Sequence, residues 1–563
     1  MAGEDEIHLP EPIIQRIQSF LTGKEAARTA MFSKSWHSAW LTRPNLDLDE
    51  LHFKVICNRD SGFKEYAKET IKRYEQSNLK IESFKLYMYF YHGCTHELAK
   101  ELIVKSLRIG ATRLNLRLHC KPFVLPNGVF ATDNLVKLSL GFVLPNEVFG
   151  TDNLVELSLG GCSIKLDDGV IIKCRRLESF SLHHDVSISI DTFSKIVSSC
   201  PSIENLSILS IFYQHSDEYE RVEEQGPRVD AAATAMAVGV VDNLIPKLRC
   251  LVLGYESFKT LCLGDLLSRF SFLKDFTLYD YNTAGIDDSI FEEGIQISNC
   301  SLERIKLVMK GLVGYFCNVR RPRRPRVKFD VPSVCKFTYE GAVIPCLSFK
   351  STPPTREWES RVYIICHKKH DLSTFWFTEL SELLTELSQS KTHLSLNASR
   401  NKSSFDYKVG EIIILRKNEL ENLMIDMTDL PSFSCYALFD GLFRLCRPKL
   451  ITQYYEDDPD KQLYDREYEY DYDYDNDDDM EQTNIDLLCQ TLVQGINIKV
   501  SSPTQFMYGL NDLEEVKAQA LDMNDVPAEW KPIPLESLLD ADTPYKYVQA
   551  KIRTRLLLKW KPI

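Results

Sequence analysis

Apolar residues recur along most of the chain with the spacing apolar-x-x-apolar-x-apolar. The clearest copies lie in a duplicated stretch, because residues 123–140 and 142–159 agree at 15 of 18 positions. The two copies end in Leu135/Leu138/Leu140 and Leu154/Leu157/Leu159. Alternate residues of a strand point to the same side, so the last two leucines of each hexamer should face one core. A unit this short cannot bury that face alone, and stacked neighbours supply the missing surface.

The same hexamer continues outside the duplication. Neighbouring copies are 19–32 residues apart, except for one step of 45 residues that holds an insertion or an unrecognised repeat. This spacing is the signature of a leucine-rich repeat. It predicts an α/β solenoid, an irregular leucine-rich-repeat horseshoe. The further copies are Ile81/Phe84/Leu86, Ala111/Leu114/Leu116, Leu177/Phe180/Leu182, Ile203/Leu206/Ile208, Leu248/Leu251/Leu253, Leu273/Phe276/Leu278, Leu302/Ile305/Leu307 and Val334/Phe337/Tyr339.

The first fifty residues follow a helical period instead. Pro12 suits a first helical turn, Gly23 is placed to end that helix, and Ser33 is placed to cap a third helix that carries Trp36 and Trp40. Between these signals, apolar residues recur at helical spacing. Three short helices in about 45 residues bury too little of their own chain to enclose this much apolar surface. Part of it should therefore face a partner or the next domain. The periodic residues of the first helix are Ile13, Ile14, Ile17, Phe20 and Leu21.

The stretch LPEPIIQRIQSFLTGKEAARTAMFSKSWHSAWLTRPNLDLDE resembles the F-box that heads plant F-box/leucine-rich-repeat proteins. It departs from that pattern at Ser35, where the family commonly has Arg, and at Met31-Phe32, where it has smaller aliphatic residues. Residues 331–349, 377–396 and 438–449 and the C-terminal end resemble, more loosely, blocks that follow the repeats in these proteins. No segment is assigned to the separately named FBD domain. The matching features are Leu9-Pro10 before an acidic residue, Ile14, Ile17, Phe20-Leu21, Lys24-Glu25-Ala26, Arg28, Phe32-Ser33-Lys34, Trp36 and Trp40.

The resemblance implies a non-catalytic substrate receptor of a Skp–cullin–F-box ubiquitin ligase. The F-box would bind a Skp-type adaptor, which binds a cullin that carries a RING subunit, and the repeats would hold a protein substrate. For several of these residues, Ile17 and Trp40 above all, the alternative role is packing between the helices and the first repeat. The implied adaptor-binding residues are Leu9, Pro10, Ile14, Ile17, Phe20, Leu21, Lys24, Glu25, Met31, Phe32, Lys34 and Trp36.

Strand alternation also predicts the residues that point outward from the repeats. These side chains are mostly small or charged, on a broad sheet that suits protein recognition better than a deep small-molecule pocket. For any single residue, a merely solvated role is the alternative. The candidate substrate-binding residues are Lys137, Ser139, Glu156, Ser158, Asp275, Arg304, Lys306 and Lys336.

These patterns divide the 563-residue chain into five predicted segments. We expect an F-box at 1–50, leucine-rich repeats at 51–350, further degenerate repeats at 351–455, an acidic disordered insertion at 456–486 and a repeat-like C-terminal cap at 487–563. Residues 456–481 hold 14 acidic and 2 basic side chains and so account for −12 of the net charge of −13. The remainder is nearly neutral, and nucleic acid is therefore not an expected partner.

Other chemistry finds little support in the sequence. The start lacks a secretory signal and no apolar run reaches the roughly 20 residues of a membrane span, so we expect a cytoplasmic or nuclear protein with no membrane partner. The 16 cysteines form no C-x-x-C pair, and HGCTH at 92–96 and CHKKH at 366–370 lack matching metal ligands. No P-loop, H-E-x-x-H or G-x-S-x-G occurs. We expect no catalytic residue, metal or cofactor.

Two further hypotheses stay open beside the ligase receptor. One is a sensor of the same architecture that binds a small hormone-like molecule in the solenoid. The other is a repeat scaffold that binds proteins without a ligase. The basic run at 317–329 is a nuclear localisation signal, a contact for an acidic substrate or a solvated connection.

Overall fold

The computed structural model divides into two compact units, which we call the N-terminal unit (broadly residues 1–248) and the C-terminal unit (broadly residues 249–563). Each is described by itself. The structure describes residues 9–21, 23–50, 53, 62–89, 96–119, 135–140, 153–160, 163–164, 172–183, 186–209, 211–213, 245, 247–254, 263–280, 294–309, 324–351, 358–365, 374–397, 418–426, 432–457, 513–520 and 549–560.

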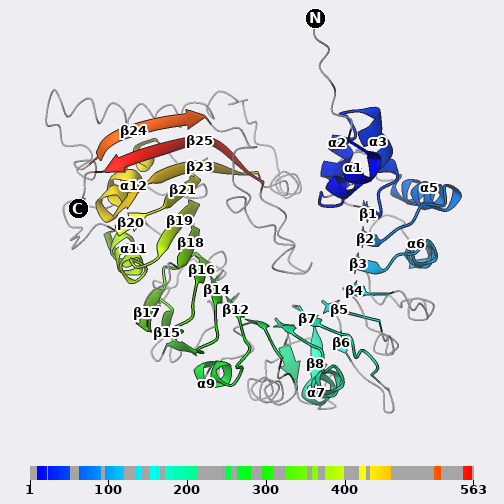
Figure 1. Ribbon diagram of the computed structural model, residues 1–563, viewed down its shortest axis with the longest axis horizontal. Helices are drawn as coiled ribbons and strands as arrows, with labels where there is room; N and C mark the ends of the chain where they lie inside the picture. Colours follow the sequence, from blue (N-terminus) through cyan, green and yellow to red (C-terminus); the bar gives the residue numbers. More distant parts are fainter. Residues whose placement is uncertain are drawn as a thin grey trace, which may run out of the picture. The chain divides into compact units, whose positions relative to one another are not determined.

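A parallel ladder in chain order forms the centre of the N-terminal unit (Figure 1). Its strands are β1 (Asn45–Asp49), β2 (Ser83–Tyr89), β3 (Arg113–His119), β4 (Lys137–Leu140), β5 (Glu156–Leu159), β7 (Ser179–Leu182) and β9 (Asn205–Ile208). The duplicated hexamers stack in register, with Leu138 opposite Leu157. Helices α5 (Phe63–Gln76), α6 (His96–Arg108) and α7 (Ile190–Ser199) and a small parallel sheet of β6 (Ser163–Ile164), β8 (Ser187–Ser189) and β10 (Ile211–Tyr213) lie in the connections.

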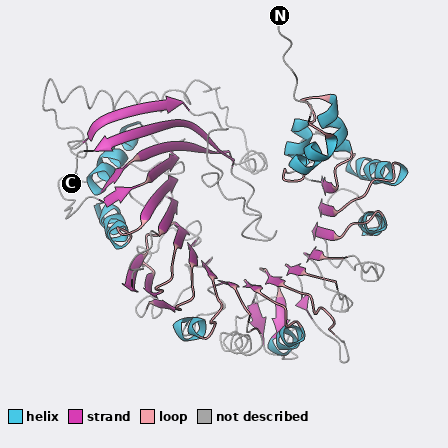
Figure 2. Cartoon of the chain, viewed as in Figure 1, coloured by secondary structure: helices cyan, strands magenta, loops and turns pink. Residues whose placement is uncertain are grey.

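The C-terminal unit repeats this plan (Figure 2). Its parallel ladder consists of β11 (Cys250–Gly254), β12 (Asp275–Asp280), β14 (Arg304–Met309), β16 (Lys336–Gly341), β18 (Glu359–Ile365), β19 (Lys391–Asn397), β21 (Asn422–Asp426) and β23 (Leu450–Asp457). The connections hold α9 (Leu263–Ser268), α11 (Thr374–Glu386) and α12 (Ser432–Leu445). They also hold two small parallel sheets, β13 (Ile295–Ser298) with β15 (Arg326–Asp330) and β17 (Cys346–Ser351), and β20 (Asn418–Leu420) with β22 (Cys446–Pro448).

The ladder ends differently from the predicted repeat-like cap. β25 (Gln549–Trp560) runs antiparallel to β23, and β24 (Leu513–Ala520) runs antiparallel to β25. An antiparallel strand covers the exposed edge of β23 without the crossover that another parallel strand needs. The acidic run also begins inside the fold, because Glu456 and Asp457 pair with β25, whereas residues 458–486 lie outside the described residues.

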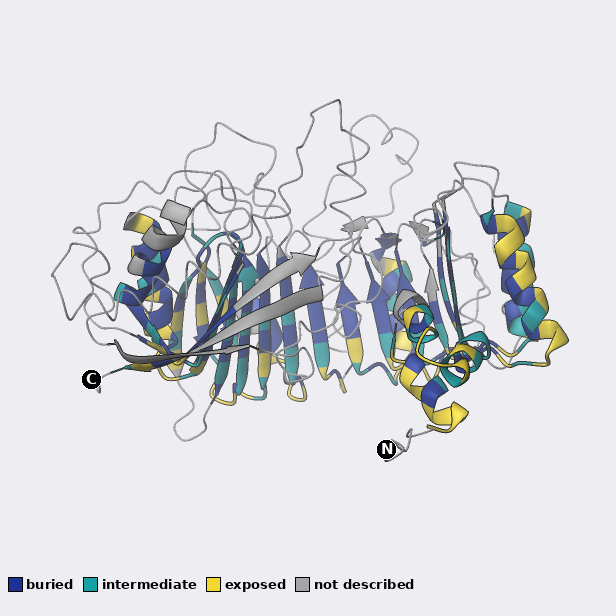
Figure 3. Cartoon of the chain, turned by 90° about the horizontal axis from the view of Figure 1, so that it is seen from above, coloured by how far each residue is buried: buried dark blue, intermediate teal, exposed yellow. Residues whose placement is uncertain are grey.

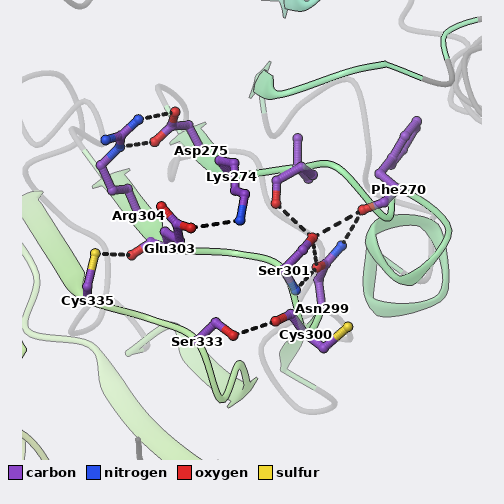
Figure 4. Close-up of polar contacts among 11 residues, drawn as sticks. Phe270, Lys274, Asp275, Asn299, Cys300, Ser301, Glu303, Arg304, Ser333 and Cys335 are labelled. Carbon is purple, nitrogen blue, oxygen red and sulfur yellow. Dashed lines mark hydrogen bonds and ion pairs between the residues drawn. The ribbon is translucent and has the colours of Figure 1, made fainter. Parts of the chain in front are cut away.

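All ten predicted hexamers place their last two apolar residues in parallel strands, and those with described side chains are buried (Figure 3). Neighbouring repeats are tied by polar contacts in the turns before the strands (Figure 4). The buried Asn299 side chain donates to the carbonyls of Leu267 and Phe270 (2.5 and 2.9 Å) and accepts from the Ser301 backbone N–H (2.7 Å). The result is a repeat-type α/β fold.

Candidate functional site

Three short helices precede the strands of the N-terminal unit: α1 (Glu11–Gln18), α2 (Gly23–Thr29) and α3 (Lys34–Leu41). Two of the predicted signals form as expected, because Pro12 lies in the first turn of α1 and the Ser33 hydroxyl accepts the Trp36 backbone N–H at 3.3 Å. The third was wrong: α1 already ends at Gln18, and Gly23 begins α2. The apolar side chains buried between the helices are few and mostly small. They are Ile14, Ala26 and Ala39.

A buried amide joins the three helices. The Gln18 side chain of α1 is fully buried, and its Nε2 donates to the Thr29 hydroxyl of α2 (2.9 Å) and the Trp36 carbonyl of α3 (3.2 Å). Gln15, one turn earlier, donates to the Thr42 hydroxyl at 2.7 Å. Hydrogen bonds therefore align helices that share little apolar area.

The large apolar side chains of this segment lie outside. Ten large apolar residues are exposed in the described part of the chain, and six of them fall between positions 9 and 32. Met31 is 85% exposed, Phe20 73% and Phe32 71%. Apolar residues exposed singly are ordinary, but a group marks an interaction site. We call this group the helical apolar surface: Leu9, Ile13, Ile17, Phe20, Met31 and Phe32.

Two ring contacts order part of this surface. The Phe32 ring meets the half-buried Trp36 ring edge-on, with centroids 5.7 Å apart. The Arg16 guanidinium lies over the Phe20 ring, 4.8 Å from its centroid. Aromatic side chains held in this way are partly ordered before a partner binds, which lowers the entropy cost of binding.

The structure separates the predicted adaptor-binding residues into three groups. Leu9, Pro10, Ile17, Phe20, Met31, Phe32 and Lys34 are exposed, and Leu21 and Trp36 are half-buried. Ile14 is 1% exposed, so its placement on an adaptor-binding surface was wrong: it packs inside the helices. The side chains of Lys24 and Glu25 lie outside the described residues. Sequence reasoning left out Ile13, although its position four residues before Ile17 puts both on one helix face.

The outward side of the strands in the N-terminal unit is less open than predicted. Ser158 is 2% exposed, and its hydroxyl lies 2.8 Å from Nε2 of His183, which follows β7 and is itself buried. The expectation that Ser158 lies on an open surface was therefore wrong. Lys137 and Glu156 are partly exposed and form an ion pair across β4 and β5 (2.5 Å). The side chain of Ser139 lies outside the described residues.

The C-terminal unit carries charges on the same side of its strands. Strand register aligns Asp275, Arg304, Lys336 and Glu359 in one row on β12, β14, β16 and β18. A second row, two residues further along, aligns Lys306, Thr338, Arg361 and His393 on β14, β16, β18 and β19. We call the set the charged strand face: Asp275, Arg304, Lys306, Lys336, Thr338, Glu340, Glu359, Arg361 and His393.

Most of these charges pair across neighbouring strands. Arg304 makes a two-pronged contact with Asp275, with Nη2 2.5 Å from Oδ2 (Figure 4), and this hydrogen bonding raises the pKa of Arg304. Lys306 lies 3.6 Å from Glu340. A partly exposed pair such as Arg304–Asp275 contributes about 0–1 kcal/mol, so it orders the face more than it stabilises the fold.

Glu359 is the acidic residue at the β18–β19 end of the charged strand face. Its carboxylate lies 2.6 Å from Nε of Arg361 and 3.5 Å from Nε2 of His393. Burial acts to raise the pKa of Glu359, but the hydrogen bond from Arg361 and the neighbouring cations lower it. Burial lowers the pKa of His393, against the charge of Glu359, so the neutral ring is favoured.

Sequence reasoning placed Asp275, Arg304, Lys306 and Lys336 on this face but missed Glu340, Glu359, Arg361 and His393. The signal for Glu340 was the alternation in KFTYEG at 336–341, and the signal for the other three was the alternation in ESRVYII at 359–365 and in KTHLSLN at 391–397. The stretches 359–365 and 391–397 fall in the segment that was predicted only as degenerate repeats.

Other candidate sites gain nothing from the structure. Within the described ranges, no three His, Cys, Asp or Glu side chains gather as metal ligands, and no helix there is both long and apolar enough to cross a membrane. HGCTH lies outside the described residues except for His96, and CHKKH lies wholly outside them. Of the basic run, Arg324 contacts the carbonyl of Ile344 (3.1 Å) and the carboxylate of Glu382 (2.5 Å) and so ties a loop to α11.

Comparison with known proteins points to one group of relatives, although no protein-family model matches the chain. An Arabidopsis thaliana F-box/LRR-repeat protein is 28% identical over 218 residues, 37% of this chain and 40% of the relative. A putative Arabidopsis F-box/FBD/LRR-repeat protein is 25% identical over 280 residues, 48% of this chain and 56% of the relative. An Arabidopsis FBD-associated F-box protein is 47% identical over 53 residues, 9% of this chain and 12% of the relative.

The aligned segments thus span 40–56% of the length of the first two relatives, so those alignments leave much of each protein uncompared. Several such Arabidopsis proteins align at 24–32% identity over longer stretches. Their names agree with the two parts found here, a short helical segment and a ladder of repeats. The chain is a homologue of plant F-box/LRR-repeat and FBD-associated F-box proteins.

Proposed function

We propose that the chain is the substrate-recognition subunit of a Skp–cullin–F-box ubiquitin ligase. In this proposal, helices α1, α2 and α3 form an F-box that binds a Skp-type adaptor, and the adaptor links the chain to cullin and the RING subunit. The repeats hold a protein substrate. The chain performs no chemistry itself but raises the local concentration of the substrate near the ubiquitin-charged enzyme.

The helical apolar surface is the observation that supports adaptor binding. A helical unit that buries Ile14, Ala26 and Ala39 but exposes Phe20, Met31 and Phe32 has its apolar area arranged for a partner. Burying one such side chain contributes about 1.5–3 kcal/mol, which offsets part of the entropy cost of association. Lys34, exposed at the start of α3, supplies a polar rim.

The proposal extends to the organisation of the chain. We propose an F-box at 1–50, leucine-rich repeats at 51–350 bent into a horseshoe, further degenerate repeats at 351–455, an acidic insertion after β23 and a cap that ends with β24 and β25. The outward strand residues Lys137, Glu156, Asp275, Arg304, Lys306 and Lys336 are the proposed substrate contacts.

Adaptor binding can be tested with the purified full-length chain and a plant Skp-type adaptor. We expect the double variant Phe20→Ala/Met31→Ala to raise the dissociation constant, measured by calorimetry, at least about 100-fold. The reason is that the variant lacks two large apolar side chains that the adaptor would bury. The matched control is Phe272→Ala/Phe375→Ala, since Phe272 and Phe375 are each 61% exposed but lie outside the helical apolar surface. The control should bind like the unaltered chain.

Two results would contradict the proposal. If the folded, unaltered chain binds no adaptor at high concentration, the chain is a repeat scaffold without a ligase. If the control pair weakens binding as much as Phe20→Ala/Met31→Ala, the adaptor uses another surface. Reconstitution with cullin and RING subunit then shows whether the bound complex promotes ubiquitin transfer.

A further inference from the structure

The centre of the charged strand face is a hydroxyl surrounded by cations. Thr338 of β16 has Lys306 of β14 and Arg361 of β18 as its register partners on either side. Lys336 lies two residues before Thr338 on the same strand and points to the same side. Because neighbouring strands are about 4.8 Å apart, the backbones of the two flanking residues lie about 10 Å apart across β16.

The acids of this face already have partners, and one cation does not. Asp275 pairs with Arg304, Glu340 with Lys306, and Glu359 with Arg361. In the described part of the chain, Lys336 forms no ion pair, although it stands between Arg304 and Glu359 in the register. The ammonium of Lys336 is therefore the uncompensated charge of the cluster.

The position of Lys336 is unfavourable for a cation. Burial first, and then the charge of Arg361, lower the pKa of Lys336, and Glu359 offsets this only in part. A half-buried ammonium without a partner destabilises the free protein. A bound anion would supply the missing partner in a site with reduced water screening.

We propose that Lys336, Thr338, Lys306 and Arg361 bind a carboxylate side chain from an acidic segment of a partner protein that lies across β14, β16 and β18. The carboxylate accepts from the Lys336 ammonium and the Thr338 hydroxyl, with the charges of Lys306 and Arg361 on either side. This inference rests on the proposed function, under which the repeats hold the substrate. The substrate class is then a protein with an exposed acidic segment.

The charge balance favours a carboxylate over a phosphate group. The face carries four cations (Arg304, Lys306, Lys336 and Arg361) and three acids (Asp275, Glu340 and Glu359), which leaves one positive charge when His393 is neutral. One carboxylate neutralises that charge. A phosphate group carries nearly two negative charges and would meet Glu340 and Glu359 at the border of the site.

The test uses fluorescence anisotropy with the full-length chain and three fluorescein-labelled peptides of identical length. One peptide alternates glutamate with small residues, the second has glutamine at the glutamate positions, and the third has phosphoserine there. We expect the glutamate peptide to bind at least about tenfold more tightly than the glutamine peptide, and added salt to reduce this difference.

Variants assign the difference to the site. Lys336→Met keeps the apolar stem and should abolish the preference for the glutamate peptide, whereas Lys336→Arg should keep part of it. The matched control is Lys350→Met, because Lys350 of β17 is 81% exposed and lies in a separate small sheet. It should leave the preference unchanged. The urea midpoint of Lys336→Met, expected to be equal to or above that of the unaltered chain, shows that loss of binding is not loss of folding.

The outcomes separate this inference from the proposed function. Equal binding of the glutamate and glutamine peptides, unchanged preference in Lys336→Met, or binding of only the phosphoserine peptide would each overturn it. Adaptor affinity is measured on the same proteins, and Lys336→Met should bind the adaptor like the unaltered chain. A chain that prefers the glutamate peptide but binds no adaptor would overturn the proposed function alone.

Discussion

The three N-terminal helices and the repeat strands distribute their large apolar side chains in opposite ways. The strands bury Phe276, Phe337 and Tyr339 almost completely and turn charged side chains outward. The helices bury the Gln18 amide, Ile14 and two alanines and turn Phe20 and Met31 outward. The strands are therefore stabilised by their own stack, whereas the helices keep their apolar area for another surface.

The comparison predicts that equal substitutions have very different effects in the two regions. Phe337→Ala removes a ring with no exposed area and should lower the free energy of unfolding by about 3–5 kcal/mol. Phe32→Ala removes a ring that is 71% exposed and should change the free energy of unfolding by less than about 0.5 kcal/mol. Urea unfolding of the two variants gives both values.

Similar losses for Phe337→Ala and Phe32→Ala would remove the contrast. In that case the helical apolar surface would be packed by its own chain in solution. Phe272→Ala, another exposed ring, serves as the control for the urea measurement and should behave like Phe32→Ala.

The second prediction concerns what holds the helices together. Gln18→Ala removes the hydrogen bonds from Gln18 to Thr29 of α2 and to Trp36 of α3, and it leaves a gap at a fully buried position. We expect it to lower the free energy of opening these helices by about 1–3 kcal/mol. Hydrogen exchange of the α1, α2 and α3 amides in the full-length chain measures this directly.

The effect should be local. Amides of β14 and β16 should exchange as in the unaltered chain, because these strands belong to the other compact unit. Gln15→Ala removes a hydrogen bond to Thr42 that is less buried than those of Gln18, and it should therefore have a smaller effect than Gln18→Ala. Equal protection of α1 in Gln18→Ala and the unaltered chain would show that apolar packing, and not the amide, joins the helices.

The same comparison explains how far the sequence predicts the fold. The hexamers from Ile81 to Tyr339 were readable because each strand of the ladder turns two apolar residues inward. After residue 350 the sequence no longer predicted individual strands, because β18 and β19 have Ser360 and Thr392 at their first inward positions. These two hydroxyls are buried and hydrogen-bonded to each other at 3.0 Å, so a polar pair replaces the apolar one and breaks the pattern.

The candidate sites were predictable in kind but not residue by residue. Helical periodicity indicated an apolar excess near the N-terminus, but it does not distinguish the buried Ile14 from the exposed Ile13 and Ile17, because all three belong to one apolar stripe. Strand alternation gives Ser158 an outward position, but it carries no information on His183, whose ring contacts the Ser158 hydroxyl from beyond β7 and leaves Ser158 buried. Contacts between repeats decide which outward residues reach solvent.

The smallest expected effect tests how weakly the outward polar residues are coupled to folding. Burial lowers the pKa of His393 below its ordinary value of 6.5, so the unfolded chain binds more protons than the folded chain as the pH falls below 6.5. The free energy of unfolding should therefore decline as the pH falls from 6.5 towards the pKa of His393 in the folded chain.

The pKa of Glu359 is lowered from 4.5, so Glu359 loses its contribution to stability only at lower pH, as its carboxylate becomes protonated. His393→Gln should flatten the urea midpoint between about pH 7 and about pH 5, whereas Ser395→Ala, the next outward residue of β19, should keep the slope. An unchanged slope in His393→Gln would mean that the ring is equally solvated in both states, and that the charged strand face is as open to water as the helical apolar surface.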